Sequence, residues 1–416
     1  MEFGRWESQS PFHSMVYSIE QFKTLLQTHS TPLDFFPTQE GGNFRICGES
    51  DPRFRIVRYD KKSSDMKNPL TKWLRSTVWD TQTNVPVCIS PPKAEQAEQP
   101  PCDTSLLVQD FLDGTMVNVF WIQEGDGWTA HISTRSQLGA SGNFYSQRSF
   151  AELFQDALNE KGISLDSLGE SIRSVFGKES FVRAYFASFL LQHPEHRVVN
   201  RISKPALYAV HVGQTLGTGV VKIQDITEST PNELLQGMAI KQYPMTGFKK
   251  DDDYNSFVNG LLRTQKWFWQ GLTFKDAQGL RWRMRNPEYL NVRALRGSEA
   301  LPLERWLRLR RNGQVVEYVK CYPEERQMFW DFEQRFRQLT SDVFTAYCSV
   351  HKSHESKLTD HPKHISPCVF RLHAHYLEHL KPEQQTVKMR DCIEVINGMT
   401  LLEQKRLMMP RNEVLA

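Results

Sequence analysis

The sequence has few cysteines and no long apolar run. Its seven cysteines are scattered through 416 residues and odd in number, which favours reduced thiols over a disulfide framework. No apolar stretch approaches the roughly 20 residues that a membrane-spanning helix needs. The N-terminal residues carry charges and lack the apolar core of a secretory signal. We therefore expect an intracellular protein of the cytoplasm or nucleus, or of a virion if a virus encodes it, with no membrane partner.

The chain also lacks a strong net charge and any internal repeat. Its 51 lysines and arginines nearly balance 48 aspartates and glutamates, which gives a formal net charge of +3. That value is too small to imply a nucleic-acid partner, so local clusters of charge must carry such an argument. A hydrophobic content of 39% with 24% charged residues is ordinary for a soluble globular protein, and the length allows one to three domains.

The hydrophobic patterns predict interleaved helices and strands over about the first 295 residues. Residues 14–28 and 149–162 have the apolar spacing of helices, and short strands begin at Phe54. Residues 91–101, bracketed by prolines, predict a surface loop. Two strand-like runs lie on either side of Asp113-Gly114, a dipeptide that is also a common hairpin turn. The expected fold class is α+β.

Helical spacing dominates after Gly297, where apolar residues recur every three or four positions. Phe329, Phe332 and Phe336 follow this spacing and are expected in a helix core. We therefore divide the chain into an N-terminal extension over 1–52, a mixed domain over 53–297 and an α-helical C-terminal domain over 298–416.

The central segments contain a series of short motifs in a fixed order. They are Arg75-Ser-Thr-Val, Pro-Pro-Lys93, Phe111-Leu-Asp113-Gly114, HISTRSQLG with Arg135, FLLQHPEHRVV over 189–199, Gln270-Gly271-Leu272, and Arg283-Met-Arg285 followed by Tyr289. Over residues 50–297 this order resembles the RNA ligases of the covalent nucleotidyltransferase superfamily, in particular the bacteriophage RNA-ligase-1-like branch. The resemblance implies a nucleotidyltransferase-like domain of mixed antiparallel sheets and helices.

The resemblance also implies chemistry that several residues here do not support. A family lysine attacks the α-phosphate of ATP, but Phe111 occupies its position and has no nitrogen. The acidic residue of the next motif matches Leu190, and the glutamate of the Glu-Gly motif matches Gln270, which removes charge that would help to hold a metal. Two family lysines match Arg283 and Arg285, which keep the positive charge only.

Two functions follow from this pattern. The first is an RNA-ligase-like pseudoenzyme that has lost covalent transfer and binds RNA or a nucleotide, or serves as an assembly protein with protein partners. The second is an active ATP-dependent RNA ligase that uses ATP and Mg²⁺, with a nucleophile such as Lys93 and carboxylates such as Asp113 and Glu195. We favour the first, because several charged catalytic positions are altered together.

Arginines provide the main candidates for phosphate binding, because their planar fork matches phosphate oxygens. Together with the resemblance, this implies that the nucleotide- or phosphate-binding residues are Arg75, Asp113, Gly114, Arg135, Gln270, Arg283 and Arg285. Nine arginines and no lysine lie between residues 281 and 311, interleaved with Trp282, Tyr289 and Trp306, which could stack on bases. The alternative for this stretch is a solvated face with internal salt bridges.

Histidines cluster late in the chain, over residues 351–379, with Cys348 and Cys368 nearby. The short spacings and the pair His375 and His379, one helical turn apart, are compatible with a structural zinc site. No Cys-x-x-Cys pair anchors such a site, and solvent-facing imidazoles are the alternative.

Overall fold

The computed structural model describes residues 16–49, 51–101, 106–177, 179–243 and 251–409, so Cys102 and parts of the predicted terminal segments lie outside the described residues. Contacts between Cα atoms divide the chain into unit 1, residues 1–291, and unit 2, residues 292–416. The division lies within α8 (Pro287–Arg296), and the boundary expected at residue 297 is just past the end of this helix.

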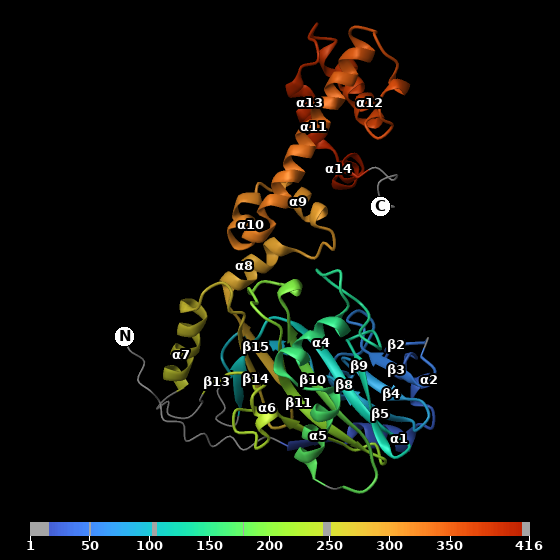
Figure 1. The fold of residues 1–416 in the computed structure, drawn as a ribbon, viewed down its shortest axis with the longest axis vertical. Helices are drawn as coiled ribbons and strands as arrows, with labels where there is room; N and C mark the ends of the chain where they lie inside the picture. Colours follow the sequence, from blue (N-terminus) through green and yellow to red (C-terminus); the bar gives the residue numbers. More distant parts are fainter. Residues whose placement is uncertain (1–15, 50, 102–105, 178, 244–250, 410–416) are drawn as a thin grey trace. The chain divides into compact units, whose positions relative to one another are not determined.

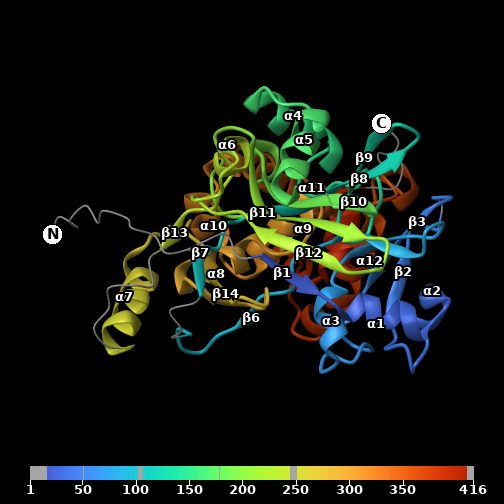
Figure 2. The same cartoon turned by 90° about the horizontal axis from the view of Figure 1, so that it is seen from below.

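The described part of unit 1 contains three sheets (Figures 1 and 2). The six-stranded sheet has the order β1 (Val16–Ile19), β12 (Val221–Asp225), β11 (Ala206–Leu216), β10 (Val182–Gln192), β8 (Thr115–Glu124) and β9 (Gly127–Ser133). The five-stranded sheet has the order β13 (Gln242–Tyr243), β7 (Leu107–Asp110), β14 (Gly271–Lys275), β15 (Arg281–Arg285) and β6 (Glu95–Gln96). The four-stranded sheet has the order β2 (Arg45–Cys47), β3 (Phe54–Arg58), β4 (Thr77–Asp80) and β5 (Val85–Ile89). These strands pair antiparallel, except for β15 with β6.

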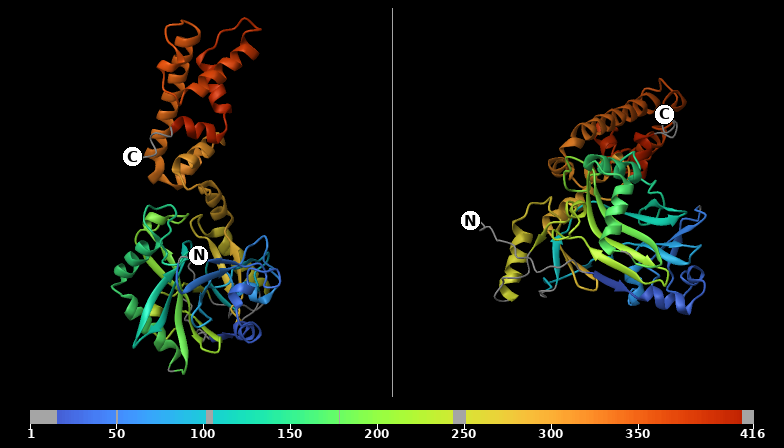
Figure 3. Two further views of the ribbon diagram at one scale, coloured as in Figure 1. Left: turned by 90° about the vertical axis from the view of Figure 1, so that its right-hand side faces the viewer. Right: turned by 60° about the horizontal axis from the view of Figure 1, so that its bottom comes forward.

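The central strands of the six-stranded sheet, β8, β10 and β11, are buried on both faces, which explains why they are apolar at successive positions. In β8, Val119 and Trp121 pack under α4 (Phe150–Lys161) and α5 (Leu165–Phe176). Phe120 points the other way and packs with side chains of the four-stranded sheet. Figure 3 shows α4 and α5, in green, on one face of this sheet and the blue N-terminal segments on the other.

The five-stranded sheet has one apolar face and one polar face. Leu272, Phe274 and Met284 form a core with Val258 of α7 (Asp251–Thr264). Because side chains alternate along a strand, the residues between these positions project from the opposite face. That opposite face contains the candidate site.

Shorter helices complete unit 1, and every element of the described part of unit 2 is helical. Besides α4, α5 and α7, the described part of unit 1 has the short helices α1 (Gln21–Thr28), α2 (Pro32–Phe35), α3 (Pro69–Trp73) and α6 (Glu233–Gln236) and the 3-10 turn η1 (Pro194–His196). Unit 2 contains α9 (Pro302–Arg311), α10 (Val315–Cys321), η2 (Pro323–Glu325), α11 (Arg326–His351), η3 (Leu358–Asp360), α12 (Ser366–His375), η4 (Tyr376–Leu380), α13 (Met389–Gly398) and α14 (Leu401–Met408). Phe329 and Phe336 of α11 are buried, as their spacing predicted.

The predicted α+β class is confirmed, and two local expectations are wrong. Residues 16–19, expected at the start of a helix, form β1, because pairing with β12 buries Tyr17 and Ile19 on one side of the sheet. Residues 91–101 are not simply a surface loop, because they include β6 and the buried Pro91 and Pro92. Within the described ranges, no helix combines the length and apolar character needed to cross a membrane.

Candidate functional site

The segment from Phe111 to Gly114 connects two different sheets. It leaves β7 of the five-stranded sheet and enters β8 of the six-stranded sheet, so the hairpin alternative for Asp113-Gly114 is wrong. A Cβ atom at Gly114 would lie 2.5 Å from the carbonyl oxygen of Leu191 in β10. Only glycine therefore fits at this crossing without a shift of the backbone.

The Asp113 carboxylate fixes the surroundings of this crossing. Its Oδ2 atom accepts hydrogen bonds from the backbone N–H groups of Val199, at 2.8 Å, and Asn200, at 3.1 Å. Its Oδ1 atom accepts a hydrogen bond from the Tyr289 hydroxyl at 3.0 Å. Three donors therefore occupy this side chain, which gives it a structural role: it ties together β7, the segment after η1 and α8.

Apolar or neutral side chains stand where the resemblance expects a lysine and two carboxylates. The backbone N–H of Phe111 donates to the Gly271 carbonyl at 2.8 Å, so Phe111 extends the pairing of β7 with β14. Leu190 of β10 has its Cγ atom 3.1 Å from the place where a Gly114 Cβ would be. Gln270 is 8% exposed and directly precedes β14. None of these three side chains can carry a charge.

Arginine side chains of β15 gather on the polar face of the five-stranded sheet. Arg281, Arg283 and Arg285 alternate along the strand with residues that pack toward α7, so the three share one face. Their cross-strand partners on β14 are Lys275, Thr273 and Gly271. We call the set Lys275, Arg281, Arg283 and Arg285 the cationic face.

Phe111 borders this face. The guanidinium carbon of Arg285 lies 5.4 Å from the centre of the Phe111 ring, which is within the range of a cation–π contact. The Nε atoms of Arg283 and Arg285 are buried and have no hydrogen-bond partner among the residues that the structure describes. Buried donors without partners are unfavourable, so these guanidinium groups are suited to an external acceptor.

Cations from three other segments converge on the cationic face. Arg75 follows α3, Lys93 precedes β6 and Arg135 follows β9. Burial lowers the pKa of Arg283, and the charges of Arg285 and Arg75 lower it further. Burial and the charges of Lys61, Arg283, Arg75 and Arg135 lower the pKa of Lys93.

Arg75 responds in the same way, since burial and then the charge of Arg135 lower its pKa, although nearby Tyr59 opposes the shift. Burial thus lowers the pKa of Arg75, Arg283 and Lys93, and the charge of at least one neighbouring cation lowers each of them further, while Tyr59 opposes the shift of Arg75 and Arg283. The predicted residues Arg75, Arg135, Arg283 and Arg285 are thus brought to one place.

A buried carboxylate, Asp225, lies at the Lys275 end of the cationic face. Asp225 of β12 forms an ion pair with Lys275, and both side chains are almost fully buried. Burial raises the pKa of Asp225, and burial lowers the pKa of Lys275, because each charged form loses its hydration. Burial and the charge of Arg75 lower the pKa of Arg281 to about 10. The sequence analysis missed Lys275 and Asp225; the only signal was a lysine ending the apolar run Leu-Thr-Phe-Lys.

The carboxylates considered for Mg²⁺ have other partners. Glu195 accepts hydrogen bonds from Arg148 and Ser146, both at 3.2 Å, and Asp113 holds the three donors described above. Among the described residues, no three or more His, Cys, Asp or Glu side chains lie close enough to hold a metal ion. Glu195 and Asp113 therefore both already accept hydrogen bonds from protein groups.

The remaining arginines of the 281–311 stretch belong to unit 2 and form internal contacts. Arg305 and Arg296 bind Glu325, Arg308 binds Glu299 and Arg310 binds Glu333. These contacts agree with the alternative of internal salt bridges for this part of the stretch. The expectation that Tyr289 and Trp306 present faces to bases is wrong, because they are 3% and 1% exposed.

The late histidines lie mainly beside one another and beside backbone or hydroxyl groups. His351 and His373 stack with ring centres 4.0 Å apart, and His375 and His379 are 4.9 Å apart. His361 lies 2.8 Å from the Ser356 hydroxyl. Cys368 is buried and its thiol contacts the sulfur of Met399 at 3.8 Å. These are the surroundings of the histidines and of Cys368, which were considered for a structural zinc site.

No family model matches the chain, and no curated protein matches it. Solved structures that are similar to it include three mutant forms of an RNA ligase from Naegleria gruberi. An alanine mutant with ATP and Mn has 11% identity and a TM-score of 0.32 over 49% of this chain and 57% of that one. A second alanine mutant with ATP and Mn has 10% identity and a TM-score of 0.30 over 49% and 63%.

A methionine mutant with AMP and Mn has 9% identity and a TM-score of 0.29 over 56% of this chain and 68% of that chain. The present chain thus spans 57% of the first of these ligase chains.

Proposed function

We propose that unit 1 binds a phosphate-bearing ligand, RNA or a nucleotide, on its cationic face and does not form a covalent nucleotidyl-lysine. The observation that carries this proposal is the convergence of Arg75, Arg283 and Arg285, whose charges act on Arg283 together, with Arg285 beside the Phe111 ring. A phosphate would offset this mutual repulsion and accept hydrogen bonds from the guanidinium groups.

We also assign different roles to the residues of the connection from β7 to β8. Asp113 and Gly114 maintain the crossing between the two sheets, which needs no chemistry. Phe111 supplies a ring beside Arg285 in place of a nucleophile. An RNA-ligase-like protein with these residues keeps the shape of a phosphate site and loses the group that would attack the phosphate.

The test is the affinity for a short 5′-phosphorylated oligouridylate, measured by fluorescence anisotropy over a range of salt concentrations. We expect the logarithm of the affinity to fall linearly with the logarithm of salt concentration. Arg283→Ala combined with Arg285→Ala should weaken binding about tenfold or more and reduce the magnitude of the salt slope by about 2, one for each lost phosphate contact.

A matched control removes the same charge elsewhere. Arg335→Ala with Arg337→Ala changes two exposed arginines of α11, and it should leave the affinity almost unchanged. Equal losses in the two double variants would mean that overall charge drives binding. Unchanged affinity in the Arg283 and Arg285 variant would remove the cationic face as the site.

The alternative function is an active ATP-dependent RNA ligase that uses Lys93. The observation in its favour is that Lys93 is accessible at the surface. Partial loss of hydration and its cationic neighbours lower its pKa, which raises the fraction of neutral, nucleophilic amine. The protein is incubated with ATP or GTP labelled at the α-phosphate, with Mg²⁺ or Mn²⁺, and then denatured. Label that disappears in Lys93→Ala would establish the alternative, and unlabelled protein that still binds RNA would support the pseudoenzyme.

A further inference from the structure

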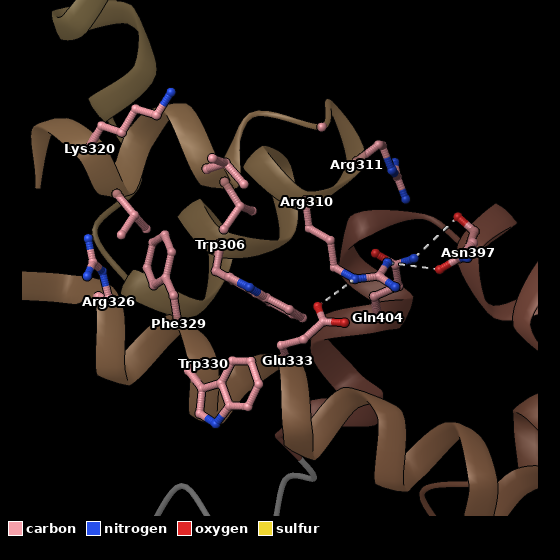
Figure 4. A pocket seen from close by; sticks show the side chains of 14 residues that line it. Trp306, Arg310, Arg311, Lys320, Arg326, Phe329, Trp330, Glu333, Asn397 and Gln404 are labelled. Carbon is pink, nitrogen blue, oxygen red and sulfur yellow. Dashed lines mark hydrogen bonds and ion pairs between the residues drawn. The ribbon is translucent and has the colours of Figure 1, made fainter. Parts of the chain in front are cut away.

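Unit 2 contains a groove of about 910 Å³ between α9, α10, α11 and the α13–α14 segment (Figure 4). Its lining comprises Trp306, Arg310, Arg311, Gly313, Val315, Val316, Val319, Lys320, Arg326, Phe329, Trp330, Glu333, Asn397 and Gln404. We call it the α10 groove. Its volume lies in the range of sites that enclose a ligand or a peptide side chain, roughly 300 to 1,000 Å³.

The floor of the α10 groove is apolar and rigid. Trp306 and Phe329 are buried, and Trp306 packs edge-on against Phe336 with ring centres 5.7 Å apart. Phe329 stacks on Tyr318 at 5.2 Å. These contacts hold the rings in place, so the floor needs no rearrangement to receive a side chain.

Two large apolar side chains at the edge of this floor remain in water. Val316 of α10 is 71% exposed, and Trp330 of α11 is 59% exposed. Both line the groove beside the buried rings, and Figure 4 shows Trp330 next to Phe329 and Trp306. Exposed apolar groups that continue a buried apolar floor mark a surface that another molecule covers.

The rim of the α10 groove is positively charged. Four cations and one carboxylate line it, and the carboxylate, Glu333, already pairs with Arg310. Arg310 also donates to the Asn397 side chain at 2.8 Å, so it is fixed in position. Among the described residues, Lys320 and Arg326 have no carboxylate partner, and each lies one helical turn from an exposed apolar residue, Val316 and Trp330 respectively.

We propose that the α10 groove binds an acidic peptide segment of a partner protein, with a bulky apolar side chain in the groove and carboxylates facing Lys320 and Arg326. The combination of an apolar floor with an unneutralised cationic rim matches such a segment in shape and charge. Nucleic acid fits less well, because single-stranded platforms present successive aromatic faces, and Trp330 is the one exposed aromatic ring among the residues that line this groove.

The proposal is independent of the cationic face in unit 1, and it is tested on the full chain with a displayed library of random peptides. Peptides that are enriched on the wild-type protein are synthesised with a fluorescent label, and their affinities are measured by anisotropy. We expect the enriched sequences to carry net negative charge and at least one bulky apolar residue. A selection that enriches no peptide, or peptides without acidic residues, would overturn the proposal.

Two groove variants and one control locate the binding. Val316→Ala with Trp330→Ala removes the exposed apolar edge, and Lys320→Glu with Arg326→Glu reverses the rim charge. Each should reduce peptide affinity at least tenfold. Lys363→Glu with Lys381→Glu makes the same charge change at exposed positions that do not line the groove, and it should change the affinity less than twofold.

All changed residues are exposed, so unfolding midpoints should stay close to that of the wild type and would reveal a variant that fails to fold. Equal affinity of the peptides for wild type and both groove variants would place binding elsewhere. An oligouridylate whose affinity falls in the groove variants, without peptide binding, would identify nucleic acid as the occupant and overturn the proposal.

Discussion

The arginines of β15 and those of α9 are close in sequence but differ in what surrounds them. Arg283 and Arg285 on β15 have other cations and an aromatic ring as neighbours. Arg305 and Arg308 on α9 each meet a carboxylate, Glu325 and Glu299. One arginine-rich stretch therefore contains two kinds of residue, one suited to a ligand and one to the fold.

The difference follows from the secondary structure that carries each group. On β15, alternation places every second residue on one face, so three arginines repel one another across a narrow strip. On α9, the helix distributes its arginines around its circumference toward different neighbouring helices and turns. Unneutralised positive charge is tolerated where a ligand can neutralise it, and buried charge needs a permanent partner.

The largest effect on stability is expected from removing the carboxylate of Glu325, which pairs with Arg305 of α9. Arg305 donates to both oxygens of Glu325, at 2.9 and 2.8 Å, and the Tyr318 hydroxyl donates at 2.9 Å. Glu325→Gln leaves buried guanidinium groups without a counter-charge and should lower the free energy of unfolding by about 3–5 kcal/mol. Urea-induced unfolding measures this, with the exposed Glu317→Gln as control. A change below about 1 kcal/mol, the size expected of an exposed pair, would show that the network is not needed for the fold.

The same carboxylate predicts a dependence of stability on pH. Burial opposes ionisation of Glu325, but the charges of Arg296 and Arg305 outweigh it and hold its pKa below the usual 4.5. A lowered pKa in the folded state contributes stability above the unfolded pKa, and this contribution disappears as pH falls through the folded pKa. The difference in unfolding free energy between wild type and Glu325→Gln should therefore be constant near neutral pH and shrink below about pH 4.5. A difference that grows in acid would contradict the charge assignment.

The smallest expected effect is on the stability of the β15 side. Arg283→Ala with Arg285→Ala relieves repulsion among half-buried cations and removes one cation–π contact, two terms of opposite sign and similar size. The free energy of unfolding should change by less than about 1 kcal/mol in urea titrations. A loss comparable with that of Glu325→Gln would erase the distinction between the two groups.

The sequence predicted much of the architecture because many apolar patterns are compatible with only one type of secondary structure. Helix α4 lies where its apolar pattern indicates, and so do β7 and β8, the two strand-like runs on either side of Asp113-Gly114. The prediction of a helix over residues 16–19 was wrong, because long-range pairing of β1 with β12 overrides a weak helical spacing. Pairing partners that are two hundred residues apart leave no local trace in the sequence.

The candidate site was predictable in its residue types and not in its organisation. The resemblance pointed to Arg75 and Arg135 and the arginine-rich stretch to Arg283 and Arg285, and the fold brings these four residues together. The sequence could not separate the β15 arginines from those of α9, because the carboxylate partners Glu325 and Glu333 lie on other elements. The structural role of Asp113 was equally hidden, since its donors come from residues 199, 200 and 289.

The most direct test of the account is the rate at which phenylglyoxal modifies each arginine, followed by peptide mass spectrometry with and without a 5′-phosphorylated oligouridylate. The account predicts that RNA slows modification of Arg283, Arg285 and Arg75, and that Arg305 and Arg308 react slowly in both states because carboxylates already hold them. Protection confined to the arginines of α9, or absent from β15 at saturating RNA, would contradict it.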